Sequence, residues 1–336
     1  MKKVFFMMSL ALMAFAVTSC SHEEVNDIQT ANIEEAKVII DLKNVNAELL
    51  ANAPSETRGW SSWTTKEKAK VVSADVAGAV AGGKAGAWTG AKVGTFLGNP
   101  ITGGVFGATI GAIVGGAWSS WINSPNEACE MAPIGDENTN LDDFDIISQS
   151  CRLLINDDLS INEEFVNSSV EPINYESKAI RKKMKVGGNG IDVNQDLIEQ
   201  SKLDENSLVV GRMHNAMLSV LDGSIDIQSS TEIEGESELK RALFNSEELM
   251  NSCRNIKTDD SNLTSDKMLN KVMELFNQVL LEYPSKADDV AFIIGKYIDV
   301  IEQTTELTKD QKTHIKYGLS TALYSSIYWE QEFKNK

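Results

Sequence analysis

Between Gly78 and Gly115 the chain places glycine at almost every fourth position. Because each glycine inside a helix costs about 1 kcal/mol relative to alanine, such a run indicates helices whose backbones must touch. Residues four apart share one face of a helix, and repeated GxxxG spacing is typical of closely packed helices, above all in membranes. Asn99-Pro100 splits the run into two arms, which predicts a helical hairpin. The packing positions are Gly78, Gly82, Gly86, Gly90, Gly94 and Gly98 in the first arm, and Gly103, Gly107, Gly111 and Gly115 in the second.

The two arms of the expected hairpin differ in charge. No Asp, Glu, Lys or Arg occurs between residues 93 and 126. The second arm, residues 101–122, would be about 30 Å long, which is the thickness of a bilayer core. We therefore predict a membrane-active hairpin, with a soluble packed hairpin and a glycine-rich linker as alternatives. The first arm, residues 71–98, is less apolar, and its Lys84 and Lys92 would reach water or anionic lipid.

Two Trp-Ser-Ser-Trp motifs bracket the glycine-rich region. In a hairpin both motifs emerge at the same end, where tryptophan can bury its ring and keep its N–H in contact with water. We expect these four rings at a membrane–water interface together with the two lysines. The residues are Trp60, Trp63, Trp118 and Trp121.

The glycine faces also bear on assembly. A four-residue step drifts by about 40° on a helix of 3.6 residues per turn, so each glycine face winds around its arm. One straight partner helix cannot cover such a face, whereas a right-handed crossing or two neighbours can. The sequence therefore predicts membrane lipid and further copies of the chain as partners, the latter through the glycine ridges.

The first 20 residues are typical of an export signal, with two lysines followed by an apolar stretch. Residues 17–20, Val-Thr-Ser-Cys, resemble a bacterial lipobox, which implies that Cys20 is acylated. The following Ser-His-Glu-Glu resembles the acidic tag of surface lipoproteins of Bacteroidota. The resemblance implies a lipid-anchored protein at the outer membrane or cell surface, or one released from it.

Charge is distributed unevenly along the chain, whose formal net charge is −18. Residues 21–57 carry eight acids and two lysines, and we expect an acidic tether there with at most one short helix or strand. Residues 58–122, the hairpin segment, are net positive, and the remainder is strongly acidic. This balance disfavours nucleic acid as a partner. The polar junction at Arg58-Gly59 is a candidate site of proteolytic processing.

Beyond a linker at residues 123–139, residues 140–336 read as an acidic helical domain. Helical spacing predicts a helix over 206–222 and three more helices at the end of the chain, which would form an antiparallel three-helix bundle. Those three span 265–283, a segment beginning at Ser285 and Asp288, and a segment from Thr308 and Gln311 to about 330. The expected fold class is mainly α, a glycine-zipper hairpin plus this acidic domain.

Catalytic chemistry is not indicated. His214 follows a Gly-x-x-His-Asn pattern that is similar to a segment of Bacteroidota lipoproteins, but no nucleophile or acid motif points to it, and we expect a structural role. If Cys20 is acylated, Cys129 and Cys151 could close a loop and leave Cys253. Their spacing matches no zinc site. We expect no enzyme activity, no metal and no cofactor.

Two functions fit these features. The hairpin is similar to glycine-zipper bacteriocins in its GxxxG runs, its cationic arm and its tryptophans, and Arg58-Gly59 resembles sites cut by clostripain-type proteases. This resemblance implies a membrane-inserting antibacterial toxin that is activated by cleavage after Arg58. The alternative is a structural outer-membrane lipoprotein that keeps the hairpin in its own envelope. In the second case the acidic domain would bind an envelope protein or receptor.

Overall fold

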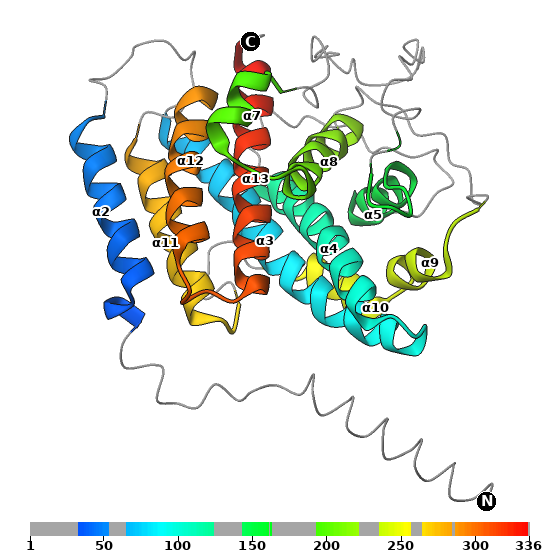
Figure 1. The fold of residues 1–336 in the computed structure, drawn as a ribbon. Helices are drawn as coiled ribbons and strands as arrows, with labels where there is room; N and C mark the ends of the chain where they lie inside the picture. The colour runs from blue at the N-terminus through cyan, green and yellow to red at the C-terminus, as the bar shows by residue number, and fades with distance from the viewer. Residues whose placement is uncertain are drawn as a thin grey trace, which may run out of the picture. The chain divides into compact units, whose positions relative to one another are not determined.

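We describe a computed structural model of the 336-residue chain. The structure describes residues 33–53, 65–123, 143–160, 162, 193–221, 235–256, 264–283 and 286–334. Over these residues all extended regular elements are helices and no strand occurs, so the expected mainly α fold is confirmed (Figure 1). Residues 37–336 belong to one compact unit. The hairpin and the acidic helices, which we expected as separate domains, are therefore parts of the same unit.

The helices follow in the order α2 (Lys37–Ala51), α3 (Thr65–Phe96), α4 (Pro100–Asn123), α5 (Asp143–Leu154), α7 (Gln195–Ser201), α8 (Glu205–Leu221), α9 (Glu238–Phe244), α10 (Glu247–Arg254), α11 (Lys267–Glu282), α12 (Ala287–Gln303) and α13 (Lys309–Lys334), with a 3-10 turn (Ile33–Glu35) before them.

Helices α3 and α4 form the predicted hairpin, and the turn between them is built from the residues that divided the glycine run. Gly98 adopts a φ of 82°, a left-handed conformation that glycine reaches without strain. Asn99 then caps α4, because its side-chain oxygen accepts a hydrogen bond of 3.1 Å from the backbone N–H of Thr102. Pro100 occupies the first helical position, where its missing N–H is not needed.

The other helices enclose much of this hairpin (Figure 1). Helix α13 lies along α3, while α8 packs against both α13 and α4; α5, α9, α10 and α11 complete the contacts. We call these six helices the shell. Among the described residues α4 is the single helix long and apolar enough to cross a membrane, although the core helix of a soluble protein meets the same test. Most of α4 is indeed buried, including Ile110, Ile113 and Val114.

The three C-terminal helices occur close to where the sequence placed them. The start of α13 is a reciprocal pair, in which Thr308 Oγ1 accepts from the Gln311 N–H and Gln311 Oε1 accepts from the Thr308 N–H. The start of α12 differs from the expectation at Ser285 and Asp288: the backbone N–H of Lys286 donates instead to Asp289, one residue further along.

The three helices also do not pack only on one another. Helix α13 makes most of its contacts with α3 and α8, while α2 packs against α11 and α12. In residues 21–57 we expected an acidic tether with at most one short helix or strand, and the structure has the helix α2 there. Buried Asn46 fastens it to the C-terminal helices by donating to the Leu275 carbonyl at 2.8 Å and accepting from the Tyr297 hydroxyl at 2.7 Å.

Candidate functional site: the enclosed hairpin

The glycine ridges of α3 and α4 face each other within one chain. A methyl group added at Gly86 would overlap the carbonyl oxygen of Gly107, and the pairs Gly82–Gly111 and Gly90–Gly103 repeat this contact along the hairpin. Gly78, Gly94 and Gly115 also lie in the seam. Backbone-to-backbone contact on this scale is possible only without side chains. Nine of the ten predicted packing glycines therefore contact the opposite arm.

Gly98 is the exception among these glycines. Its conformation serves the turn, and a methyl group built on it would meet nothing within 4 Å. The spacing placed it in the ridge because it continues the four-residue rhythm, but the helix ends at Phe96, two residues before it. Its assignment as a helix-packing residue is therefore wrong.

The closed seam bears on self-assembly. Each ridge already has the other ridge as its partner, so further copies could use the same glycines only if α3 and α4 separated. The homo-oligomer that we predicted from the ridges thus stays a prediction, and it requires an opened hairpin.

A buried polar cluster lies where the hairpin meets the shell. Asp75 of α3 is fully buried and accepts a hydrogen bond from the Ser325 hydroxyl of α13. His214 of α8, also fully buried, has its Nε2 atom 3.6 Å from the Asp75 carboxylate. Its Nδ1 atom is 3.1 Å from the side-chain oxygen of Asn215. Four residues from three helices thus share one enclosed polar site.

Burial controls the ionisation of this cluster. Loss of water disfavours the carboxylate and raises the pKa of Asp75 to about 8, and the hydrogen bond from Ser325 opposes this shift only in part. Burial likewise lowers the pKa of His214 to about 4. At neutral pH we therefore expect an uncharged pair. This is the state that a protein interior tolerates best.

The same cluster contains a serine, a histidine and an aspartate, but its geometry does not suit catalysis. The Ser325 hydroxyl donates to the carboxylate rather than to the imidazole, and no substrate could reach side chains that are fully buried. The expectation of a structural histidine thus agrees with the placement of His214.

The structure also gives a physical reason for the Gly-x-x-His-Asn pattern. A methyl group at Gly211 would overlap the Tyr324 ring of α13, and the Asn215 side chain donates to the Tyr324 carbonyl at 2.8 Å. His214, between them, lies against Gly116 of α4. The pattern joins α8 to α13 on one side and to the hairpin on the other, an arrangement that depends on residues distant in sequence.

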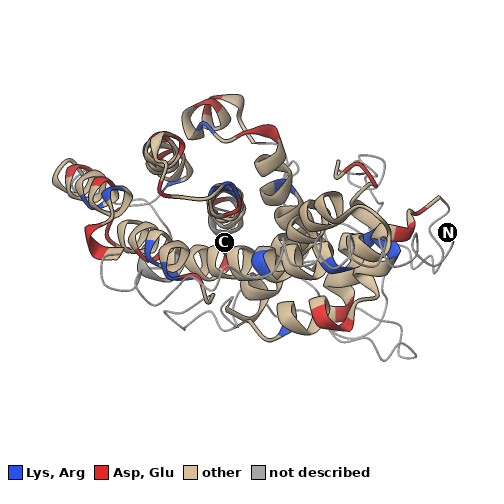
Figure 2. Ribbon diagram, turned by 60° about the horizontal axis from the view of Figure 1, so that its bottom comes forward, with Lys and Arg blue, Asp and Glu red and all other residues tan. Residues whose placement is uncertain are grey.

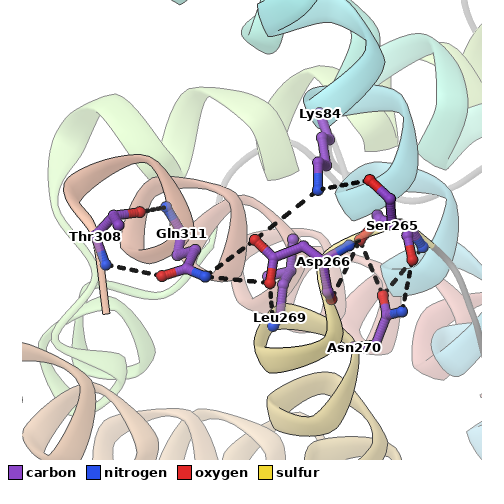
Figure 3. A network of polar contacts seen from close by, with 8 residues as sticks. Lys84, Ser265, Asp266, Leu269, Asn270, Thr308 and Gln311 are labelled. Atoms are coloured by element: carbon purple, nitrogen blue, oxygen red, sulfur yellow. Dashed lines mark hydrogen bonds and ion pairs between the residues drawn. The ribbon is translucent and has the colours of Figure 1, made fainter. Parts of the chain in front are cut away.

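A polar network ties the first arm to the ends of two shell helices (Figure 3). The ammonium group of Lys84 lies 3.9 Å from the Asp266 carboxylate. Asp266 caps α11 by accepting from the Leu269 N–H at 3.0 Å, and it accepts two bonds from the Gln311 amide of α13. Desolvation at this contact lowers the pKa of Lys84. In this structure Lys84 therefore contacts protein.

We expect Asp266→Ala to reduce the free energy of unfolding by about 2 kcal/mol, since it removes a helix cap worth about 1 kcal/mol and leaves Gln311 and Lys84 without their partner. Asp266→Asn is the matched control. Asparagine caps as well as aspartate, and the partly exposed ion pair contributes little, so we expect a loss below about 1 kcal/mol. Urea unfolding followed by circular dichroism compares the two, and equal losses would contradict this assignment.

The other predicted interface residues have protein partners where the structure describes them. The indole N–H of Trp118 donates to the Arg254 carbonyl at 3.0 Å, and that of Trp121 donates to Asp143 at 3.0 Å. Lys92 pairs with Glu248 of α10 at 2.7 Å. Both tryptophans therefore contact the shell in the enclosed state. Cys20, Arg58, Gly59, Trp60 and Trp63 lie outside the described residues.

Cys151 and Cys253 are both free and fully buried. Cys151 therefore does not close the loop with Cys129 that its spacing allowed, and Cys129 itself lies outside the described residues. Burial raises the pKa of the Cys253 thiol to about 12 and that of Cys151 further still, so neither is a reactive thiolate. Within the described part of the chain, no three His, Cys, Asp or Glu residues are grouped to hold a metal ion.

Comparison with known proteins adds no relative. No family model matches the chain, and neither a curated protein nor a solved structure shows significant similarity to it.

Proposed function

We propose that this chain is an exported, lipid-anchored protein whose hairpin inserts into a bacterial membrane, acting as an antibacterial toxin. The observation that carries the proposal is the environment of α4. This helix has no charged residue, is long enough to cross a bilayer core, and is largely enclosed by helices of the same chain. Figure 2 marks the basic and acidic residues of the described helices in blue and red. An uncharged, apolar helix such as α4 stays in aqueous solution only while other helices cover it.

The burial of α4 favours a protein that inserts into a target membrane over one that keeps its hairpin in its own envelope. A hairpin that stays in its own envelope would leave the outer face of α4 for lipid, whereas Ile110, Ile113 and Val114 are fully buried by protein. The structural outer-membrane lipoprotein remains the alternative. It requires the same segment to leave the same shell permanently.

Charge supports a masking role for the shell. The hairpin segment 58–122 is net positive and the chain after it is strongly acidic. Ion pairs cross the boundary at Lys84–Asp266 and Lys92–Glu248. Such pairs contribute little to stability, but they fix how the basic residues of the hairpin face the acidic residues of the shell. Proteolysis after Arg58 is the activation step that we propose.

The direct test uses residues 21–336, cleaved after Arg58, with dye-loaded vesicles and with related bacteria. We expect dye release and killing. The absence of both leakage and killing would overturn the toxin proposal. Leakage without killing would support insertion and reject the antibacterial role.

A pair of glycine substitutions tests whether the shell restrains the hairpin. Gly211→Val forces α8 away from α13, because the added atoms overlap Tyr324 and Ser320 of the shell. We expect it to increase the rate of dye release at least several-fold, since less free energy then holds the hairpin inside. Vesicle leakage assays at matched protein concentration measure the effect.

Gly295→Val is the matched control for this prediction. It also creates an overlap, with the Gln200 carbonyl, but at the contact between α12 and α7, and α12 otherwise packs on α2 and α13. We expect destabilisation without faster leakage. Equal acceleration by both variants would mean that leakage reports general unfolding, and the restraining role of the shell would be rejected.

A further inference from the structure

The turn end of the hairpin is apolar and exposed. Phe96 is 91% exposed and Ile101 is 81% exposed, and Leu97 and Val105 are exposed beside them. These side chains come from both arms and surround the turn. We call Phe96, Leu97, Ile101 and Val105 the tip. Large apolar side chains gathered in this way mark an interaction surface more often than scattered ones do.

Several polar groups of the turn form hydrogen bonds within the hairpin itself. The Thr95 hydroxyl donates to the Ala91 carbonyl at 2.7 Å, and Asn99 uses its backbone N–H for Gly94 and its side chain for Thr102. The Gly103 N–H donates to the Asn99 carbonyl at 3.0 Å. A segment that enters hydrocarbon must satisfy its backbone internally, whereas protein interfaces exchange hydrogen bonds with their partner.

The border of the tip carries an aromatic ring and a cation. Trp88 is half exposed, and the Lys92 ammonium lies 4.8 Å from its ring centroid. Beyond Lys92 no charge follows for more than thirty residues, through the turn and along α4. An uncharged end bordered by tryptophan and lysine matches the order in which a bilayer presents hydrocarbon and then headgroups. It is also continuous with the helix that is long enough to cross a membrane.

We propose that the tip is a docking surface for lipid, which enters the bilayer while the shell is still closed. This inference rests on the proposed membrane function and adds its first step: the exposed end of the hairpin binds before the buried part is released. The occupant is the hydrocarbon of a bilayer. A second copy of the chain cannot use the glycine ridges here, because the two arms already cover them.

The test is co-sedimentation of uncleaved residues 21–336, which contain the whole compact unit, with phosphatidylcholine vesicles. Starting after Cys20 removes the acyl group as a second anchor, and a neutral lipid removes charge attraction. We expect Phe96→Ser/Ile101→Ser to weaken binding at least tenfold. Because both side chains are exposed, the unfolding midpoint should not move.

Phe292→Ser/Ile40→Ser is the matched control, since it makes the same replacements at exposed positions of α12 and α2. We expect it to bind like the unmodified chain. Equal binding by all three proteins, or no binding by the unmodified chain, would overturn the docking proposal. So would sedimentation showing that the unmodified chain is a dimer without lipid and the tip variant a monomer.

Dye release separates this inference from the proposed function. If the unmodified chain binds vesicles through the tip but, once cleaved, releases no dye, docking stands and insertion is rejected. If the cleaved tip variant binds and releases dye as fast as the cleaved unmodified chain, insertion stands and docking is rejected.

Discussion

Gly86→Ala should destabilise the protein by about 2–4 kcal/mol, although alanine is the better helix former by about 1 kcal/mol. The added methyl group overlaps the Gly107 carbonyl, which belongs to the backbone of a helix held on its other side by the shell. The arms must separate, and the loss of close contact extends to the neighbouring glycine pairs. Gly86→Val should cost more than the total stability of many domains and prevent folding.

Gly104→Ala is the control for this prediction. It lies on α4 next to Gly103 of the ridge, but its added methyl group would be 3.6 Å from the nearest atom, which is ordinary van der Waals contact. We expect it to be neutral or to stabilise by up to about 1 kcal/mol. Thermal and urea unfolding would compare the two. Equal changes in midpoint would show that the ridges do not touch.

Stability should fall by about 2 kcal/mol between pH 6.5 and pH 8 because of Asp75. Its pKa is raised to about 8 in the folded protein, so the folded state keeps a proton that the unfolded state releases near pH 4. Each pH unit in that interval then disfavours the folded state by about 1.4 kcal/mol. The contribution of Asp75 is complete below pH 4 and is lost as the pH rises through about 8.

The histidines oppose this trend at lower pH. The pKa of His214 is lowered to about 4 and that of His314 is also lowered by burial, so their contribution is present above pH 6.5 and is lost as the pH falls. The stability contributed by these groups should therefore be greatest near pH 6.5. Only above pH 6.5 do the histidines no longer oppose the loss of stability that Asp75 causes.

The measurement is urea unfolding from pH 6 to 8.5. Asp75→Asn keeps the shape of the side chain and removes the titration, so we expect the decline between pH 6.5 and 8 to disappear. His214→Gln should keep that decline and extend it to lower pH. An unmodified chain with constant stability over this interval would contradict the buried, protonated Asp75.

The parts of the fold that the sequence predicted correctly depend on neighbours in the chain. Glycine spacing and Asn99-Pro100 gave the hairpin, and Thr308 with Gln311 gave the start of α13, because caps and turns involve residues three or four apart. The start of α12 was missed by one residue. Several polar residues compete for a cap, and only the folded backbone shows that Lys286 and Asp289 take it.

The parts that the sequence did not reveal depend on contacts between distant segments. A glycine ridge demands a close neighbour but does not say whether that neighbour is the other arm or another chain. Asp75 and Ser325 are 250 residues apart, so neither signals the buried pair. The structure places Asp75 in a buried polar contact between α3 of the hairpin and the shell helices α8 and α13.

The packing of α2 changes what proteolysis can accomplish. A cut after Arg58 breaks the chain between α2 and α3, yet α2 is still held by buried Asn46 and by the apolar side chains of Val38, Ile39 and Leu42. The product is a complex of two chains. If Cys20 carries the lipid, the body stays at the membrane for as long as α2 remains in place. The rate at which the body leaves the membrane is then set by the dissociation of α2. The protease determines only when that dissociation can begin.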